Sequence, residues 1–264
     1  MLPGLLLSAC KAEGRPHFVL GLTGFAEAAS LGGTVDAWVR MGEISRALEV
    51  LRGGGVQEVV MAGAVRRPAL SELMPDLKGA AILARIAGRA LGDDGLLSAV
   101  IAEMEREGFK VIGVDEILGD LLAHEGVMGA HSPDESAASD IAHGFKVARI
   151  LGDADVGQAV VVQQGIVLGV EAAEGTDALM ARCADLCREG PAGVLVKAKK
   201  PNQERRADLP TIAAQTVRNA KAAGLRGIAV EAGHTLVIGL ADVIAAADQT
   251  GLFVVGVAPA RRQA

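Results

Sequence analysis

Aromatic residues are scarce in this sequence, and tyrosine is absent. Its 264 residues include one tryptophan and five phenylalanines, so aromatics make up 2% of the chain whereas apolar residues make up 50%. The core must therefore be built from alanine, valine, leucine and isoleucine, the usual side chains of a parallel sheet covered by helices. We predict an α/β protein with two α/β domains and a substrate cleft between them.

Cysteines, histidine clusters and long apolar runs are also few. Cys10, Cys183 and Cys187 are odd in number and have no CxxC spacing, which favours reduced thiols in the cytoplasm. The five histidines lack metal-ligand spacing, which argues against a histidine metal site. No apolar run approaches the length of a membrane span, and the first residues lack the features of a signal peptide. We expect a cytoplasmic protein.

Positive charge is in deficit, which excludes one class of partner. The formal net charge is -6 and the chain has no basic face interleaved with aromatics, so we expect no nucleic acid partner. The motifs GxSxG, GxxxxGK[ST] and GxGxxG are missing too. Their absence removes the common hydrolase, phosphate-loop and dinucleotide interpretations.

The chain does have many apolar segments that end in glycine. The 34 glycines are typical of helix caps and of turns after strands. The pattern predicts two domains, 1–125 and 132–264, the first without the strand that usually opens an alternating α/β protein. Strands are expected near 17–20, 56–61, 109–114, 193–196, 227–230, 236–238 and 253–255, with a hairpin of 158–164 and 166–172. Helices are expected over 43–52, 93–108, 132–151, 176–186, 211–223 and 241–249, with Ser132 and Thr176 as N-caps.

The most polar stretch, residues 197–211, follows the expected strand 193–196. It contains five cations, two acids and two prolines. The cations can neutralise a diphosphate, and Asp208 can hold Mg²⁺ or orient a water molecule. Alternatively, Asp208 caps the next helix and the cations form a solvated face. Spacing alone supports both interpretations equally.

Two other expected strand ends in the second half carry carboxylates and glycine. These are 171–177 and 231–233, and their recurrence predicts one site shared with the 197–208 loop. The alternative for 171–177 is a well-capped turn. In the first half, the loop 62–68 lies where α/β proteins bind ligands, while Asp93 can be a simple N-cap.

Taken together, several segments resemble the LpxI family. They are 62–68, 92–97, 169–178, 200–203, 206–212 and 227–233. The resemblance covers nearly the whole chain in order. It implies Mg²⁺-assisted hydrolysis of the diphosphate of UDP-2,3-diacylglucosamine in lipid A biosynthesis, by water attack on the uridine-side phosphorus, to UMP and 2,3-diacylglucosamine 1-phosphate. It also implies two α/β domains with the substrate between them.

Roles are expected for single residues, for Asp208 from the resemblance and for the others from their chemistry and position. Asp208 matches the family's catalytic aspartate and is the expected metal ligand. Lys197, Lys200 and Arg206 are expected to neutralise the diphosphate. Further substrate contacts are expected from Arg67, Asp93, Asp94, Glu171, Gly175, Thr176, Asp177, Gln203, Thr211, Glu231 and Gly233.

The sequence departs from the family pattern in two places. By comparison with the family pattern, we expect the strand and glycine-rich turn that usually open the family to be missing here, and Ala64 replaces an asparagine that the family commonly has near the nucleotide. The expected partners are the acylated UDP-glucosamine and, peripherally, the inner leaflet of the cytoplasmic membrane; a homodimer is left open. The rival hypotheses are a non-catalytic nucleotide-sugar or lipid-binding protein and a diphosphatase for another nucleotide-linked substrate.

Overall fold

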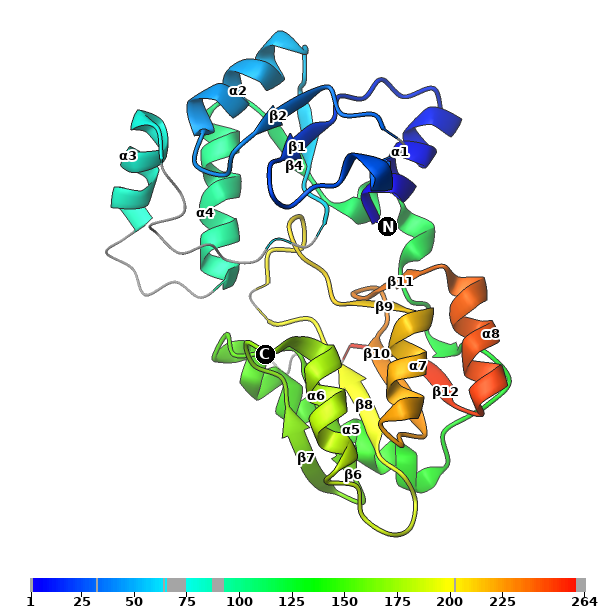
Figure 1. Ribbon diagram of the computed structural model, residues 1–264. Helices are drawn as coiled ribbons and strands as arrows, with labels where there is room; N and C mark the ends of the chain where they lie inside the picture. The colour runs from blue at the N-terminus through cyan, green and yellow to red at the C-terminus, as the bar shows by residue number, and fades with distance from the viewer. Residues whose placement is uncertain are drawn as a thin grey trace. The chain divides into compact units, whose positions relative to one another are not determined.

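The structure is a computed structural model that describes residues 2–31, 33–63, 65, 75–86, 93–201 and 203–259 (Figure 1). The chain divides into two compact α/β units, which confirms the predicted α/β class with two domains, while the substrate cleft stays a prediction. The first unit is Met1–Gly119 with Glu204–Ala207, and the second is Asp120–Gln203 with Asp208–Ala264. The segment Glu204–Ala207 thus groups with the first unit, although the sequence prediction put it in the domain 132–264.

The first unit contains short parallel strand pairs and four helices in its described part. The helices are α1 (Leu2–Ala12), α2 (Ile44–Gly53), α3 (Leu77–Ile86) and α4 (Asp93–Arg106). The strands are β1 (Leu20–Leu22), β2 (Ala37–Val39), β3 (Glu58–Val60) and β4 (Lys110–Ile112), paired in parallel as β1 with β2 and β3 with β4. Short 3₁₀ turns span Ala28–Leu31, Val114–Glu116 and Gly119–Leu121.

The core of the first unit follows from the helical spacing of apolar residues on α2. Leu48 and Leu51 are buried together with Phe109, which directly precedes β4. The strand expected at 17–20 lies two to three residues later, at β1. The single tryptophan, Trp38, is on β2, where its ring leaves no room for a side chain at Gly21 of the neighbouring strand.

The second unit is built on a six-stranded sheet in the order β5-β12-β10-β8-β6-β7. Its strands are β5 (Gly126–Val127), β6 (Ala159–Gln163), β7 (Ile166–Val170), β8 (Val194–Lys197), β10 (Gly227–Glu231) and β12 (Phe253–Val257). Strands β8, β10 and β12 are parallel, whereas β5 and β6 run antiparallel to their neighbours. The predicted strands 193–196, 227–230 and 253–255 and the predicted hairpin are confirmed.

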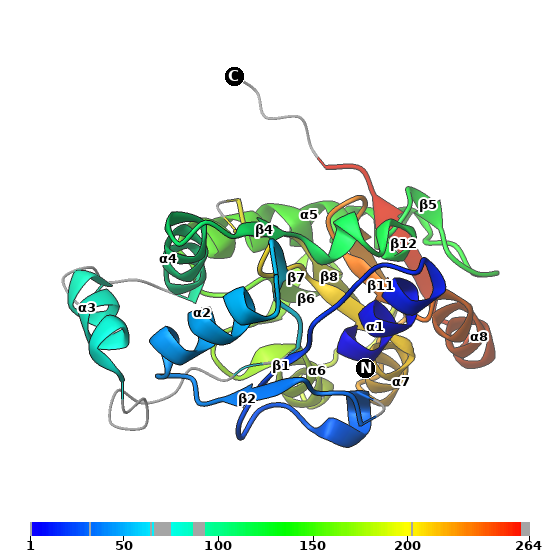
Figure 2. The same ribbon diagram turned by 90° about the horizontal axis from the view of Figure 1, so that it is seen from above.

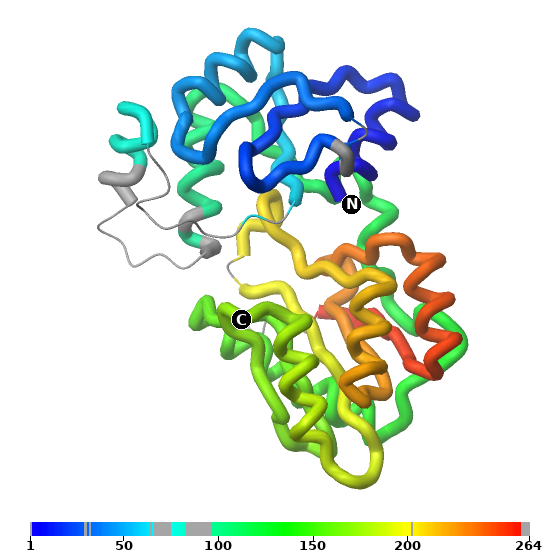
Figure 3. The backbone as a smooth tube through the Cα atoms, in the orientation of Figure 1, coloured from blue at the N-terminus to red at the C-terminus, as the bar shows by residue number. Residues whose placement is uncertain are grey.

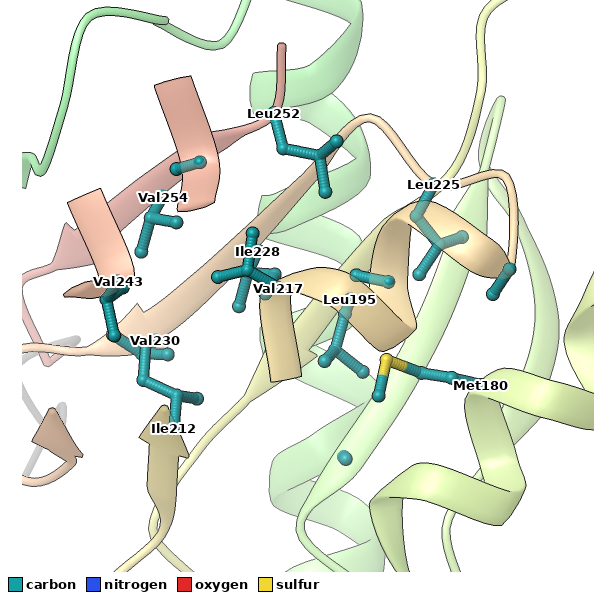
Figure 4. Packing of buried hydrophobic residues seen from close by; sticks show 14 of the residues in the cluster. Met180, Leu195, Ile212, Val217, Leu225, Ile228, Val230, Val243, Leu252 and Val254 are labelled. Atoms are coloured by element: carbon teal, nitrogen blue, oxygen red, sulfur yellow. The ribbon is translucent and has the colours of Figure 1, made fainter. Parts of the chain in front are cut away.

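Helices cover both faces of this sheet, as Figure 2 shows for α5 and α7. The helices are α5 (Glu135–Asp153), α6 (Gly175–Ala184), α7 (Ala214–Ala222) and α8 (Leu240–Thr250). Successive side chains of β8 point to opposite faces of the sheet. Leu195 packs toward α6, α7 and α8 (Figure 4), while Val194 and Val196 pack toward α5. Both faces are buried, so the strand is a continuous apolar run in the sequence. A side chain at Gly144 of α5 would put Cβ 2.5 Å from a methyl of Val196.

The hairpin of β6 and β7 is closed by Gln164 and Gly165, which both have positive φ, 53° and 75°. Its backbone can be followed in Figure 3. Asp140 of α5, 1% exposed, accepts hydrogen bonds from the amides of Gln164 (3.0 Å) and Gly165 (2.7 Å). The helix therefore fixes the turn through one buried carboxylate.

Two predicted helix starts are wrong. The N-cap of α5 is Asp134, not Ser132: its Oδ1 accepts from the Ala137 amide at 2.7 Å, and Arg226 binds the same carboxylate at 3.1 Å. A carboxylate at this position also interacts favourably with the helix dipole, which a serine does not match. In α6, Glu174 occupies the N-cap position in place of Thr176.

The helix expected over 211–223 is also shorter than predicted. Residues Thr211–Ala213 form β9, which pairs in parallel with β11 (Leu236–Ile238), and α7 starts at Ala214. The strand forms because it pairs with β11. Helical spacing in the sequence could not predict this pairing, because the partner strand is far away in the sequence. Asp208 therefore does not cap this helix, and that alternative is wrong.

Candidate active site

Charged side chains gather where the strands of the second unit end. Lys197 is the last residue of β8 and Glu231 the last of β10, and these strands are parallel neighbours. Strand β7 runs in the same direction as β8, because each is antiparallel to β6, and Glu171 follows its end. In open α/β sheets, ligands bind at this carboxyl edge.

The carboxylate of Asp208 is held by a neutral amide. Gln203 Nε2 donates to Asp208 Oδ2 at 2.6 Å and to Gln158 Oε1 at 3.3 Å. The Gln203 side chain is 4% exposed, and its Oε1 accepts from the Lys200 amide at 3.0 Å. The Gln158 carbonyl in turn accepts from the Ala198 amide, which ties the group to the end of β8.

Glu171 is a second buried carboxylate at this edge. It is 6% exposed, and it accepts from the Gln158 amide at 2.9 Å and from Thr176 Oγ1 at 2.6 Å. The hydroxyl of Thr176 thus serves Glu171 and not the start of α6. Gly175, with φ at +81°, makes the turn that brings Thr176 back to the strand end. Gln158 is common to both carboxylate groups, and a residue at the start of a predicted strand gave no sign of this in the sequence.

Lys197 is buried among carboxylates. The residue is only 5% exposed, and its Nζ donates to the Thr211 carbonyl at 3.0 Å. Burial lowers the pKa of Lys197, while the negative charges of Glu171, Asp208 and Asp177 act to raise it. The interpretation of the cations as a solvated face is therefore wrong for Lys197.

The other charged groups of this edge are paired as well. Lys200 Nζ lies 2.6 Å from Asp155 Oδ1, and the lysine side chain is 11% exposed. Glu231 accepts from the Lys199 amide at 3.0 Å and lies 3.9 Å from Arg149. Neither Asp155 nor Arg149 was singled out from the sequence, because their partners are 45 and 82 residues away.

Two further predicted contacts of the second unit have partners of their own. Asp177 Oδ1 accepts from Asn219 Nδ2 at 2.9 Å. Gly233 has φ at +69°, and its amide donates to the Ala123 carbonyl at 2.8 Å. The first pair links α6 to α7, and the second fixes the turn after β10.

Arg206 belongs to the first unit, and its ion pairs lie within that unit. The guanidinium binds Glu204 at 2.9 Å and Glu105 of α4 at 2.5 Å. Side-chain hydrogen bonds to both glutamates raise the pKa of Arg206. The neighbouring Arg205 binds Asp115 at 2.7 Å. A role of Arg206 at a diphosphate stays a prediction.

The remaining predicted positions lie in the first half. Asp93 and Asp94 open α4, as expected for an N-terminal acidic pair, but their side chains are not among those described. Arg67 and Ala64 lie outside the described residues. Their parts in substrate binding stay predictions.

The donor set at this edge fits one kind of metal site. No group of three or more histidine, cysteine, aspartate or glutamate side chains in the described residues could hold a metal ion. Magnesium, however, is commonly bound by one or two carboxylates together with substrate phosphates. Asp208 suits this arrangement: Gln203 binds Oδ2, and Oδ1 has no hydrogen-bond partner among the described residues.

Comparison with known proteins identifies the family. The family model of the LpxI N-terminal domain matches residues 1–121, and that of the LpxI C-terminal domain matches residues 124–255. The chain belongs to the LpxI family. A relative, UDP-2,3-diacylglucosamine pyrophosphatase LpxI of Caulobacter vibrioides, is 45% identical over 268 residues, which cover 99% of this chain and 95% of the relative. The resemblance stated from sequence motifs is thus confirmed.

Two further observations on the LpxI chain concern membrane-spanning helices and the cysteines. None of the helices in the described part has the length and apolar character needed to cross a bilayer. All three cysteines are free thiols, with Cys10 and Cys183 buried and Cys187 exposed.

Proposed function

We propose that this chain hydrolyses the diphosphate of UDP-2,3-diacylglucosamine to UMP and 2,3-diacylglucosamine 1-phosphate in lipid A biosynthesis, assisted by Mg²⁺. The observation that carries the proposal is the 45% identity to the Caulobacter vibrioides pyrophosphatase over 99% of the chain. The buried carboxylates and cations at the carboxyl edge of the six-stranded sheet support it, because phosphoryl transfer depends on positioned charge.

We assign the attacking water or the metal to Asp208. Its carboxylate has one oxygen bound by Gln203, and the other has no hydrogen-bond partner in the part of the chain that the structure describes. An ionised carboxylate accepts a hydrogen bond from water or coordinates Mg²⁺. Magnesium, when bound, neutralises charge on the phosphate oxygens and makes the phosphorus more electrophilic.

The reaction exchanges one phosphorus–oxygen bond for another. The water oxygen forms a bond to the uridine-side phosphorus, and the bond from that phosphorus to the bridging oxygen breaks. The bridging oxygen leaves as part of the sugar phosphate, and the proton lost by the water passes to solvent. Asp208 orients this water, and the charge that moves to the bridging oxygen requires nearby cations.

Lys197, Lys200 and Arg206 are our proposed cations. Lys197 is proposed to act through its charge without binding the diphosphate directly. It is buried, it interacts with the charges of three carboxylates, and Nζ donates to the Thr211 carbonyl. Lys200 is the nearer of the two lysines to solvent, because its side chain is 11% exposed in a part-buried pair with Asp155. We keep as proposed substrate contacts Arg67, Asp93, Asp94, Glu171, Gly175, Thr176, Asp177, Thr211, Glu231 and Gly233.

We also propose that the protein works at the membrane surface. A diacylated substrate is anchored in lipid by its two acyl chains, so the enzyme must reach it at the inner leaflet. Flotation with vesicles that contain the substrate, compared with vesicles that lack it, tests this contact.

The experiment measures UMP release from UDP-2,3-diacylglucosamine by the full chain, with Mg²⁺ and with a chelator. We expect turnover with Mg²⁺ and a loss of about 10²- to 10⁴-fold in kcat for Asp208→Asn, since the orienting carboxylate is removed. Tight binding without turnover would instead support the nucleotide-sugar or lipid-binding protein. Equal turnover of UDP-N-acetylglucosamine, which lacks the acyl chains, would sink the lipid assignment.

A further inference from the structure

We infer that Gln203 is a positioning residue that fixes the orientation of the Asp208 carboxylate, and is not a contact for the substrate. The inference rests on the proposed function for the part that Asp208 plays in hydrolysis. The geometry does not depend on the proposed function: a 2.6 Å hydrogen bond joins Gln203 Nε2 to Asp208 Oδ2.

The amide group of Gln203 is fully engaged inside the protein. Nε2 has two hydrogens to donate, and it lies within bonding distance of Asp208 and of Gln158 Oε1. Oε1 accepts from the Lys200 amide. With 4% of the residue exposed, the side chain offers a substrate neither surface nor a spare hydrogen.

Gln158, whose side chain accepts a hydrogen bond from Gln203, is held by hydrogen bonds of its backbone. The backbone of Gln158 accepts from the Ala198 amide and donates to the Glu171 carboxylate, so it is fixed at the edge of the sheet. Gln203 transmits that fixed position to Asp208. Asp208 itself lies in a loop, outside any helix or strand, and Gln203 is its one side-chain donor among the described residues.

A neutral donor suits this task better than a cation. A lysine or arginine in place of Gln203 would also hold the carboxylate, but it would neutralise the charge that Asp208 needs for Mg²⁺ or for a water. An amide occupies one carboxylate oxygen and leaves the charge in place, and the other oxygen of Asp208 has no hydrogen-bond partner among the described residues. The buried cation Lys197 donates to the Thr211 carbonyl, and its interaction with Asp208 is one of charge alone.

The test compares Gln203→Glu with Gln203→Leu. Glutamate has the same shape and can still accept from the Lys200 amide, but once ionised it cannot donate to Asp208. Leucine loses all three side-chain hydrogen bonds, those with Asp208, Gln158 and the Lys200 amide. Gln215→Glu is the matched control, because Gln215 is exposed on α7 and, among the residues that the structure describes, binds only its helical neighbours.

We expect Gln203→Glu to lower kcat by about 10²-fold with KM within about threefold of the wild type, since a displaced catalytic group slows the chemical step. Gln215→Glu should leave both constants unchanged. A higher KM with an unchanged kcat would overturn the inference in favour of a substrate contact. An unchanged kcat in Gln203→Glu together with a lower melting temperature in Gln203→Leu would reduce Gln203 to a structural residue.

Crystal structures of the wild type and of Gln203→Glu decide the inference without any activity. If the wild type does not turn over the substrate, the proposed function fails, and the positioning role is judged on the crystals alone. We expect the Asp208 carboxylate to rotate away from its wild-type position in the variant. The same carboxylate position in both crystals would overturn the inference.

Discussion

Replacement of Asp140 by alanine should destabilise the second unit by a predictable amount. Asp140 is 1% exposed and accepts from the amides of Gln164 and Gly165, both at positive φ in the hairpin turn. Each hydrogen bond to a carboxylate contributes about 1.5–3 kcal/mol, so the loss of both should lower the free energy of unfolding by about 3–6 kcal/mol. Arg226, 3.4 Å away, keeps its bonds to Asp134 and adds little to this figure.

Asp140→Asn should cost about half as much, because one oxygen remains to accept from one of the two amides. The assay is urea unfolding followed by far-UV circular dichroism, together with hydrogen exchange of a peptide that covers residues 159–170. The control is Asp153→Ala, an exposed aspartate in the last turn of the same helix. If Asp140→Ala changes exchange in the hairpin no more than Asp153→Ala does, the reasoning about the turn is refuted.

Three further predictions concern single side chains. Thr176→Val removes the hydroxyl that donates to Glu171 and should cost about 1–2 kcal/mol in thermal unfolding, whereas Thr176→Ser should cost less. Burial lowers the pKa of Lys197 below 10.5, so as pH rises from the folded-state pKa toward 10.5 the unfolded chain binds more protons and stability rises; Lys197→Met should lack this rise in urea unfolding measured across that range. Gly144→Ala should destabilise by about 1–3 kcal/mol through crowding against the sheet, while Gly53→Ala, with open space around it, should stabilise by about 0.4–1 kcal/mol; no difference between the two melting temperatures would contradict the packing argument.

Local patterns in the sequence were sufficient for most of the second unit. Strands buried on both faces leave continuous apolar runs, and β8, β10 and β12 were therefore found near their observed ends. Strand β9 was missed because its stability comes from pairing with β11, some 25 residues later. The N-cap positions of Asp134 and Glu174 were missed because a nearby serine or threonine satisfied the local rule. Arg226, distant in the sequence, binds the Asp134 carboxylate, and the Thr176 hydroxyl donates to Glu171 instead of capping α6.

The same limit applies to the candidate site. Motifs indicated Asp208, Glu171 and Lys197, because charged residues at or after the end of an apolar run can be recognised in the sequence alone. Gln158, which binds Glu171 and Gln203, and Asp155, which pairs with Lys200, were not visible, since hydrogen bonds between residues distant in the sequence leave no local pattern. Burial of Lys197 could not be foreseen either, because a lysine that follows three apolar residues reads equally well as a strand end in water.

Trp38 gives this protein a natural optical probe of one half. It is the only tryptophan in a chain without tyrosine, and it lies on β2 of the first unit with 37% of its surface exposed. Intrinsic fluorescence therefore reports on the first unit alone, while circular dichroism reports on the helices of both. Two denaturation curves recorded on one unlabelled sample will show directly whether the units melt together or one after the other.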